Sequence, residues 1–183
     1  GNIVAPSQIG SVEFAVERFS TRLVVVLGHS NCGAISATLD ELKLPAKGRS
    51  PNLRAVVDRI RPSIEPLLET ELANDPERLK RHAVRANIRH AANHLRHGSP
   101  ILEHWIAHEG LLVVGAEYSL ETGIVDFFDG MPMSWTISTS PDAGMANSSL
   151  MGACAQLREG EHPKGHSDRG CHCRWPGWIK ICD

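Results

Sequence analysis

The chain lacks several features that would assign it to a large class of proteins. The longest apolar runs span only 23–27 and 111–116, far short of the roughly 20 residues that a membrane-spanning helix needs. Basic residues are not in excess, since 19 Lys and Arg stand against 21 Asp and Glu. Nucleic acid is therefore a poor candidate partner, because polyanion-binding domains are usually basic. A hydrophobic share of 42% still predicts a folded core.

Cysteine is scarce in the first 150 residues, where Cys32 stands alone. The other four cysteines, Cys154, Cys171, Cys173 and Cys182, fall within the last 30 residues. The total of five is odd, and the opening GNIVAPSQIG has no signal-peptide pattern, which favours a reducing cytoplasm over a disulfide framework. The first residue is not methionine, and we expect the chain to be a fragment or a processed form.

The hydrophobic pattern of residues 1–129 predicts alternating strands and helices. Apolar runs at 22–27 and 111–118 are too short for helices and predict strands buried on both faces, as in parallel sheets. Segment 124–128 follows a short turn, so we expect it to pair antiparallel. Helices are predicted at 11–19, from Ala34 onward, around 53–60 with interruptions at Pro62 and Pro66, at 76–97 and at 101–108. The expected fold class is α/β: a small, mostly parallel sheet with one antiparallel closing strand and flanking helices.

The composition changes after Asp129. Residues 130–183 are rich in Ser, Gly, Pro, Met, His and Cys and have no helical or strand period. We therefore divide the chain into a domain, 1–129, and a tail, 130–183, whose order the sequence does not set. Three interpretations of the tail stay open: unselected or out-of-frame translation, a disordered appendage, or a second metal site. The candidate ligands for that site are Cys154, His162, His166, Cys171, His172, Cys173 and Cys182.

The segment Gly28-His29-Ser30-Asn31-Cys32-Gly33 joins a predicted buried strand to a predicted helix. Open parallel sheets carry their chemistry in such turns. His29 and Cys32 offer imidazole and thiolate, the preferred ligands of Zn²⁺, and a helix N-terminus at Cys32 favours the thiolate. Taken alone, the pattern also fits a buried cysteine beside a hydrogen-bonded histidine. A third interpretation is a hydrolase with Cys32 as nucleophile and His29 as base, but side chains three apart on one turn seldom have that geometry.

Histidines are also frequent on the predicted helix 76–97, where they alternate with arginines. Their spacing of three or four residues would allow a metal to bridge a pair, but the pattern is more typical of a solvated helix face. A proton relay through one of them stays open, because imidazole titrates near neutral pH. The histidines are His82, His90, His94 and His97.

The sequence around the turn extends the pattern. VVVLGHSNCGAI resembles the second zinc-ligand motif of the β-class carbonic anhydrases. Further segments resemble that family in the family's order: GNIV at 1–4, SVEFAV at 11–16, SPIL at 99–102, GLLVVGAEY at 110–118 and TGIVDF at 122–127. The resemblance covers about residues 1–128.

The resemblance implies a zinc enzyme that reversibly hydrates CO₂ to bicarbonate and a proton, and that forms homodimers or larger homo-oligomers. The family holds zinc with two Cys and one His, and His29 and Cys32 match two of these ligands. The resemblance also implies that Gly33 lines the pocket through its backbone.

The family's first motif, Cys-x-Asp-x-Arg, is absent from this sequence. That motif supplies the remaining zinc cysteine and the catalytic Asp–Arg pair, so we assign no catalytic residue in this chain. We expect the chain alone to hydrate CO₂ poorly or not at all. The alternative is an inactive subunit that acts only through dimer contacts. The strand that bears the motif is also missing, which predicts an unpaired sheet edge beside 22–27.

Overall fold

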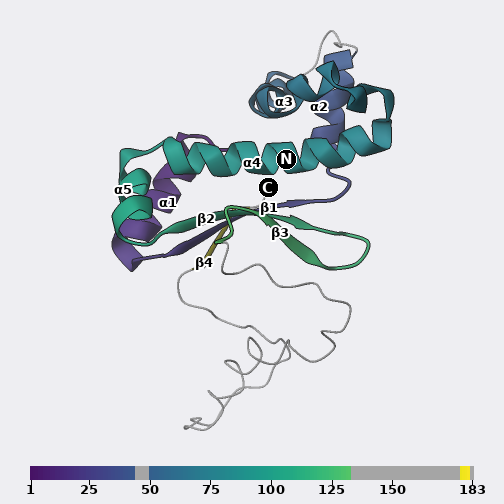
Figure 1. Ribbon diagram of the computed structural model, residues 1–183. Coiled ribbons are helices and arrows are strands. Elements are labelled where there is room, and N and C mark those ends of the chain that lie inside the picture. The colour runs from purple at the N-terminus through teal and green to yellow at the C-terminus, as the bar shows by residue number, and fades with distance from the viewer. Residues whose placement is uncertain (44–49, 133–177, 182–183) are drawn as a thin grey trace, which may run out of the picture. The chain divides into compact units, whose positions relative to one another are not determined.

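The computed structural model describes residues 1–43 and 50–132, and the backbone of 178–181. The chain divides into two compact units, one made of 1–131 with 175–183 and the other of 132–174; the first is described here. Its centre is a four-stranded sheet with the order β3-β2-β1-β4 (Figure 1). The strands are β1 (Leu23–His29), β2 (Leu112–Tyr118), β3 (Val125–Asp129) and β4 (Trp178–Ile181).

The sheet is mostly parallel, as the sequence predicts. β1 pairs in parallel with β2 on one side and with β4 on the other. β3 closes the sheet by antiparallel pairing with β2, and this ladder is irregular between Gly115 and Ala116. The predicted α/β class, with its antiparallel closing strand and flanking helices, is confirmed.

The long helix α4 (Pro76–His97) lies over one face of the sheet and runs along the strands (Figure 1). Asp75 begins this helix, because its carboxylate accepts a hydrogen bond from the Arg78 amide at 3.0 Å, and Pro76 takes the first helical position. The other helices are α1 (Pro6–Phe19), α2 (Gly33–Lys43), α3 (Pro51–Ile64), η1 (Glu65–Glu69), η2 (Glu71–Asn74) and α5 (Pro100–His108). No helix in the described segments is both long and apolar enough to cross a membrane.

The predicted interruption at Pro62 is wrong, because α3 continues through it to Ile64. A proline inside a helix removes one hydrogen bond and costs about 3 kcal/mol. Val57, Ile60 and Ile64 lie on one face of α3 and are all buried, so packing offsets that cost. Pro66 instead lies in the first turn of η1.

The core lies between α4 and the sheet. The predicted apolar stripe of α4 is buried as expected: Val84, Ile88, Ala91, Ala92 and Leu95. Glycines in the sheet allow the helix to come close. A Cβ at Gly28 would lie 2.6 Å from Ile88 Cδ1, and a Cβ at Gly115 would lie 2.9 Å from Ile88 Cγ2. A side chain at either position would force Ile88 to shift, so glycine allows the close approach.

The predicted unpaired edge beside β1 is wrong. β4 covers that edge, with the register Leu23↔Trp178 to Val26↔Ile181. No sequence pattern indicates β4, because four residues are too few to show a period and their partner lies far away in the chain. The rest of the tail, including its cysteines and histidines, lies outside the described residues.

Candidate metal centre

A cavity of about 270 Å³ lies at the carboxyl end of β1, where the sequence predicts the functional turn. We call it the β1-end cavity. It opens where parallel strands place their carboxyl ends. His29 and Cys32 both line it, so the structure brings the two predicted ligands to one space. The lining residues are Gly1, Asn2, Leu27, Gly28, His29, Cys32, Ile35, Val84, Asn87, Tyr118 and Leu120.

His29 is the last residue of β1 and lies opposite Tyr118 of β2 in the parallel register. Its Nδ1 lies 2.8 Å from the carbonyl oxygen of Ser30. Because a carbonyl oxygen only accepts, a neutral His29 carries its proton on Nδ1 and leaves Nε2 free to bind a metal. Metal-binding histidines are commonly oriented in this way.

Cys32 is 4% exposed and is followed directly by α2. Burial acts to raise the pKa of its thiol, but hydrogen bonds from the Gly1 amino group and from the backbone of Ile35 and Ala34 outweigh it. The pKa of Cys32 therefore lies below its ordinary value. The Gly1 nitrogen is 3.0 Å from Sγ. The site thus favours the thiolate, the form that binds metals.

A buried asparagine fixes the segment that covers Cys32. Asn87 of α4 accepts a hydrogen bond from the Asn2 amide at 2.6 Å and donates to the Asn2 carbonyl at 3.1 Å. Asn2 in turn donates through its side chain to the carbonyl of Leu27 at 3.1 Å. The segment is therefore tied to both α4 and β1. Asn87 is not among the predicted site residues, because its only signal in the sequence is a polar residue within the apolar stripe of a helix.

Glu121 holds the turn between His29 and Cys32 from outside the cavity. Its carboxylate accepts hydrogen bonds from Asn31 Nδ2 at 2.6 Å, Ser30 Oγ at 2.9 Å and Ser119 Oγ at 3.0 Å. The bond from Ser30, with the others, lowers the pKa of Glu121 below its ordinary value. Asn31 adopts a left-handed conformation, φ 57°, which asparagine tolerates well. Glu121 gave no signal in the sequence.

The remaining predicted residues lie apart from the two ligands. Gly33 begins α2 but is not among the residues that line the β1-end cavity, whereas Gly28 is. His82, His90, His94 and His97 are all exposed, as a solvated helix face requires. Within residues 1–43 and 50–132, no group of three or more His, Cys, Asp or Glu side chains is placed to hold a metal ion. The described part of the site therefore offers two protein ligands.

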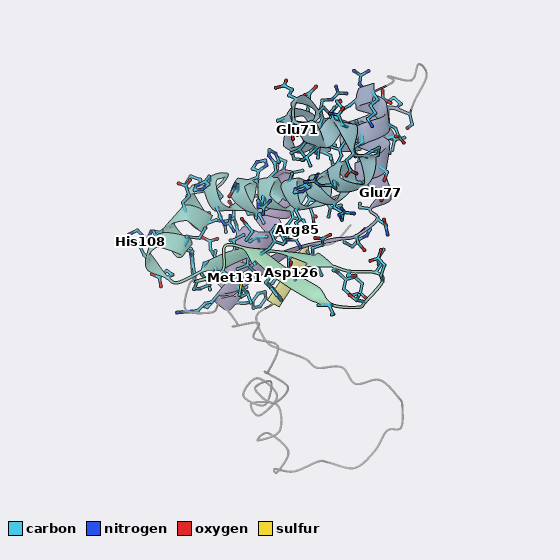
Figure 2. All side chains as sticks on the ribbon, turned by 45° about the vertical axis from the view of Figure 1, so that its right-hand side comes forward. Glu71, Glu77, Arg85, His108, Asp126 and Met131 are labelled. Carbon is cyan, nitrogen blue, oxygen red and sulfur yellow. The ribbon has the colours of Figure 1, made fainter. Side chains whose placement is uncertain are left out.

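A second hollow, of about 720 Å³, lies beside the cavity and is lined mainly by charged and polar side chains. Arg85 of α4 crosses it and forms ion pairs with Glu117 at 2.7 Å and Asp126 at 2.6 Å. Figure 2 shows Arg85 and Asp126 close together where α4 faces β3. These pairs raise the pKa of Arg85 against the opposing effect of burial. The ion pairs of Arg85 thus join α4 to the sheet.

Comparison with known proteins assigns the fold and the turn to one family. The sequence profile described as Carbonic anhydrase matches residues 1–125. The chain therefore belongs to the carbonic anhydrase family, and within it to the β class. Carbonic anhydrase 2 of Mycobacterium tuberculosis is 31% identical over 125 residues, which are 67% of this chain and 56% of that protein.

A different similarity covers a shorter stretch. Over 57 residues the chain is 58% identical to a probable transposase for the insertion sequence element IS1353 of Shigella flexneri, which is 31% of this chain and 11% of that protein. The chain thus spans little more than half the length of the mycobacterial relative, and far less of the transposase.

Solved structures agree on the fold. The β-carbonic anhydrase CafA of Aspergillus fumigatus superposes with a TM-score of 0.57 at 23% identity, covering 72% of this chain and 62% of that one. A chain from the crystal structures of two tetrameric β-carbonic anhydrases of Sordaria macrospora gives a TM-score of 0.55 at 24% identity, covering 69% of this chain and 63% of that one. At these identities the likeness concerns the fold alone.

Proposed function

We propose that this chain is a zinc-binding carbonic anhydrase subunit whose β1-end cavity takes CO₂ and bicarbonate, and that the chain alone turns over poorly. The observation that carries the proposal is that His29 and Cys32 line one cavity within the family-matched segment. Imidazole with thiolate is a donor set that suits zinc. Bound zinc would supply hydroxide at neutral pH by acidifying its water ligand.

The chain's own residues would orient the ligands and shape the space. The Ser30 carbonyl holds His29 with Nε2 free, and the lowered pKa of Cys32 supplies the thiolate. Leu27, Ile35 and Val84 form apolar walls, which suit an uncharged gas and keep bulk water away from it. The side chain of Asn87 forms its hydrogen bonds with Asn2 and Ser63, so its role is structural.

Poor turnover is proposed because the cavity is short of reactive groups. Catalytic zinc sites normally use three protein ligands, and the described residues provide two. None of the lining residues is Asp, Glu, Arg or Lys. No side chain in the described walls therefore replaces the absent Asp–Arg pair.

A homo-oligomer is proposed from the exposed apolar side chains. Phe14 and Phe19 are 60% and 67% exposed on α1 and pack edge to face, and Ile124 is 65% exposed beside β3. Large exposed aromatic residues are typical of protein–protein interfaces. We also propose a cytoplasmic location, which the free thiol of Cys32 favours.

The test is metal content, Co²⁺ absorption and CO₂ hydration of the full chain beside His29→Ala, Cys32→Ser and His90→Ala. We expect less than one zinc per chain after dialysis and weak turnover, with a thiolate-to-Co²⁺ band that Cys32→Ser abolishes. His29→Ala should lower metal affinity, by roughly 10- to 100-fold if it behaves as a ligand. His90→Ala, which changes an exposed histidine of α4, should leave binding intact. Metal binding that survives both ligand substitutions contradicts the site, and full activity with one tightly held zinc contradicts the impairment.

The alternative is an inactive subunit that acts through dimer contacts, and the two-ligand count favours it as the second candidate. It predicts no retained zinc but a stable oligomer. Light scattering on the same samples separates the two, because an oligomer without any metal or turnover supports the inactive subunit.

A further inference from the structure

The edge of β1 that faces away from β2 is here called the β1 edge. Leaving this edge without a neighbouring strand would destabilise the fold. β1 is apolar on both faces: Val24 and Val26 are buried in the core that includes α4, and Val25 is buried on the opposite face. An open edge on such a strand leaves unpaired N–H and C=O groups beside apolar side chains and invites aggregation. Within residues 1–43 and 50–132, the sheet supplies no strand for this edge.

β4 meets this need from outside the family-matched part of the chain. The family match ends at residue 125, whereas β4 begins at Trp178. The segment that forms β4 therefore lies outside the part of the chain that the family match covers.

The sequence of β4 suits an outer strand. Trp-Ile-Lys-Ile combines aromatic and β-branched residues, which favour strands, with a lysine of the kind that edge strands use against further pairing. Its parallel register places four residues opposite Leu23, Val24, Val25 and Val26. The pairing therefore covers the most apolar part of β1.

We propose that β4 is a tethered strand that completes the carbonic-anhydrase-like sheet by capping the β1 edge, so that the stability of this fold depends on the tail. The partner of the β1 edge is a segment of the same chain. The proposal concerns folding and holds whether or not the β1-end cavity binds zinc.

The alternation of a β-ladder gives a matched pair of variants. An edge strand directs every second N–H to its neighbour and the others to solvent. Proline lacks the N–H, so of Ile179→Pro and Lys180→Pro in the full chain, only one removes a hydrogen bond to β1. We expect one variant to melt several degrees lower and the other to stay close to the parent.

Hydrogen exchange of the β1 amides localises the effect. In the damaging variant, the β1 amides that face β4 should exchange about tenfold faster, because the loss of one hydrogen bond of the ladder makes it easier for β4 to separate from β1. The β1 amides that face β2 serve as the internal control and should keep their protection. If the damaging variant does not fold, a synthetic peptide of residues 175–181 should restore soluble protein.

Several outcomes overturn the proposal. Equal behaviour of the two proline variants, whether harmless or harmful, rules out a ladder between β4 and β1. Failure of the peptide to rescue an unfolded variant also counts against the strand as the missing element. Protection of β1 that rises with chain concentration would show that a second copy donates the strand, which contradicts pairing within one chain.

Discussion

The two edges of the sheet are held in different ways. β3 follows β2 after a short turn, and its acidic side chains pair with arginines of α4. β4 joins β1 from the far end of the chain, and its described link to the sheet is the backbone ladder. One edge is therefore fixed by chain connectivity and by side chains, whereas the other depends on backbone pairing. This difference explains why the sequence indicates β3 and not β4.

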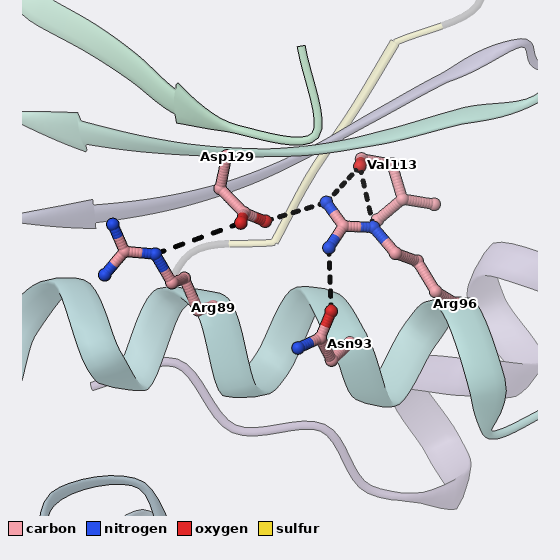
Figure 3. Close-up of polar contacts among 5 residues, drawn as sticks. All are labelled: Arg89, Asn93, Arg96, Val113 and Asp129. Carbon is pink, nitrogen blue, oxygen red and sulfur yellow. Dashed lines mark hydrogen bonds and ion pairs between the residues drawn. The ribbon is translucent and has the colours of Figure 1, made fainter.

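The β3 edge is locked by a network around Asp129, shown in Figure 3. Arg96 Nη2 lies 2.8 Å from the Asp129 carboxylate, and the same guanidinium donates to the Val113 carbonyl from Nη2 at 2.6 Å and Nε at 3.2 Å. Asn93 Oδ1 accepts from Nη1 at 2.8 Å. Arg96 thus joins α4 to β2 and β3 at once. Arg89 reaches Asp129 only at 3.9 Å.

Of the variants that test how the β3 edge is held, Arg96→Ala should lower the free energy of unfolding the most. Arg96 and Asp129 are each 19% exposed, so the change leaves a mostly buried carboxylate and the Val113 carbonyl without their partner. Hydrogen bonds to charged groups contribute about 1.5–3 kcal/mol to stability. We therefore expect the free energy of unfolding to fall by about 2–3 kcal/mol. The measurement is the free energy of unfolding in urea.

Arg89→Ala is the matched control on the same helix. Its ion pair is long and half exposed, and its guanidinium lies 4.9 Å from the Phe128 ring. Exposed pairs contribute about 0–1 kcal/mol, so we expect a loss below about 1 kcal/mol. Equal losses for the two variants would show that the Asp129 network does not fix the β3 edge.

Substitution of Gly115 by alanine tests how closely α4 and β3 approach at the irregular point of the ladder. The new Cβ would lie 2.9 Å from Ile88 Cγ2 and 3.0 Å from Asp129 Cβ. Overpacking of this kind costs about 1–3 kcal/mol, and we expect the lower half of that range because Ile88 can shift. Thermal unfolding by circular dichroism is the measurement.

Gly10→Ala in α1 is the control, because a Cβ there meets nothing within 4 Å. Alanine in a helix interior is favoured over glycine by about 0.5–1 kcal/mol, so this variant should be slightly more stable than the parent. A Gly115→Ala variant that is also stabilised would contradict the close approach.

Sequence reasoning succeeded where the signal is local. The cap at Asp75 and Pro76, the stripe from Val84 to Leu95 and the strand-turn-helix unit around His29 all depend on neighbouring residues, and the structure contains all of them.

Sequence reasoning failed where the structure depends on distant partners. β4 forms because it pairs with β1. α3 continues past Pro62 because the face that carries Val57, Ile60 and Ile64 is buried. The same limit applies to the candidate site. His29 and Cys32 belong to one short motif, whereas Asn87 holds the Asn2 segment and Glu121 holds the turn, each from another element.

Glu121 provides the smallest predicted effect, since it is exposed, and its sign follows from the pKa. The hydrogen bonds from Ser30, Ser119 and Asn31 lower the folded-state pKa of Glu121, so ionised Glu121 stabilises the fold. That stability is present above the unfolded-state pKa of about 4.3 and is lost as pH falls through the lower folded-state value. Glu121→Gln should therefore melt slightly below the parent at pH 7, because an amide nitrogen replaces one acceptor, and the difference should vanish in acid. Glu17→Gln, on the exposed side of α1, is the control and should not show this pH-dependent difference. A Glu121 difference that persists unchanged at the lowest pH at which both proteins fold would mean that shape, and not charge, holds the turn to β2.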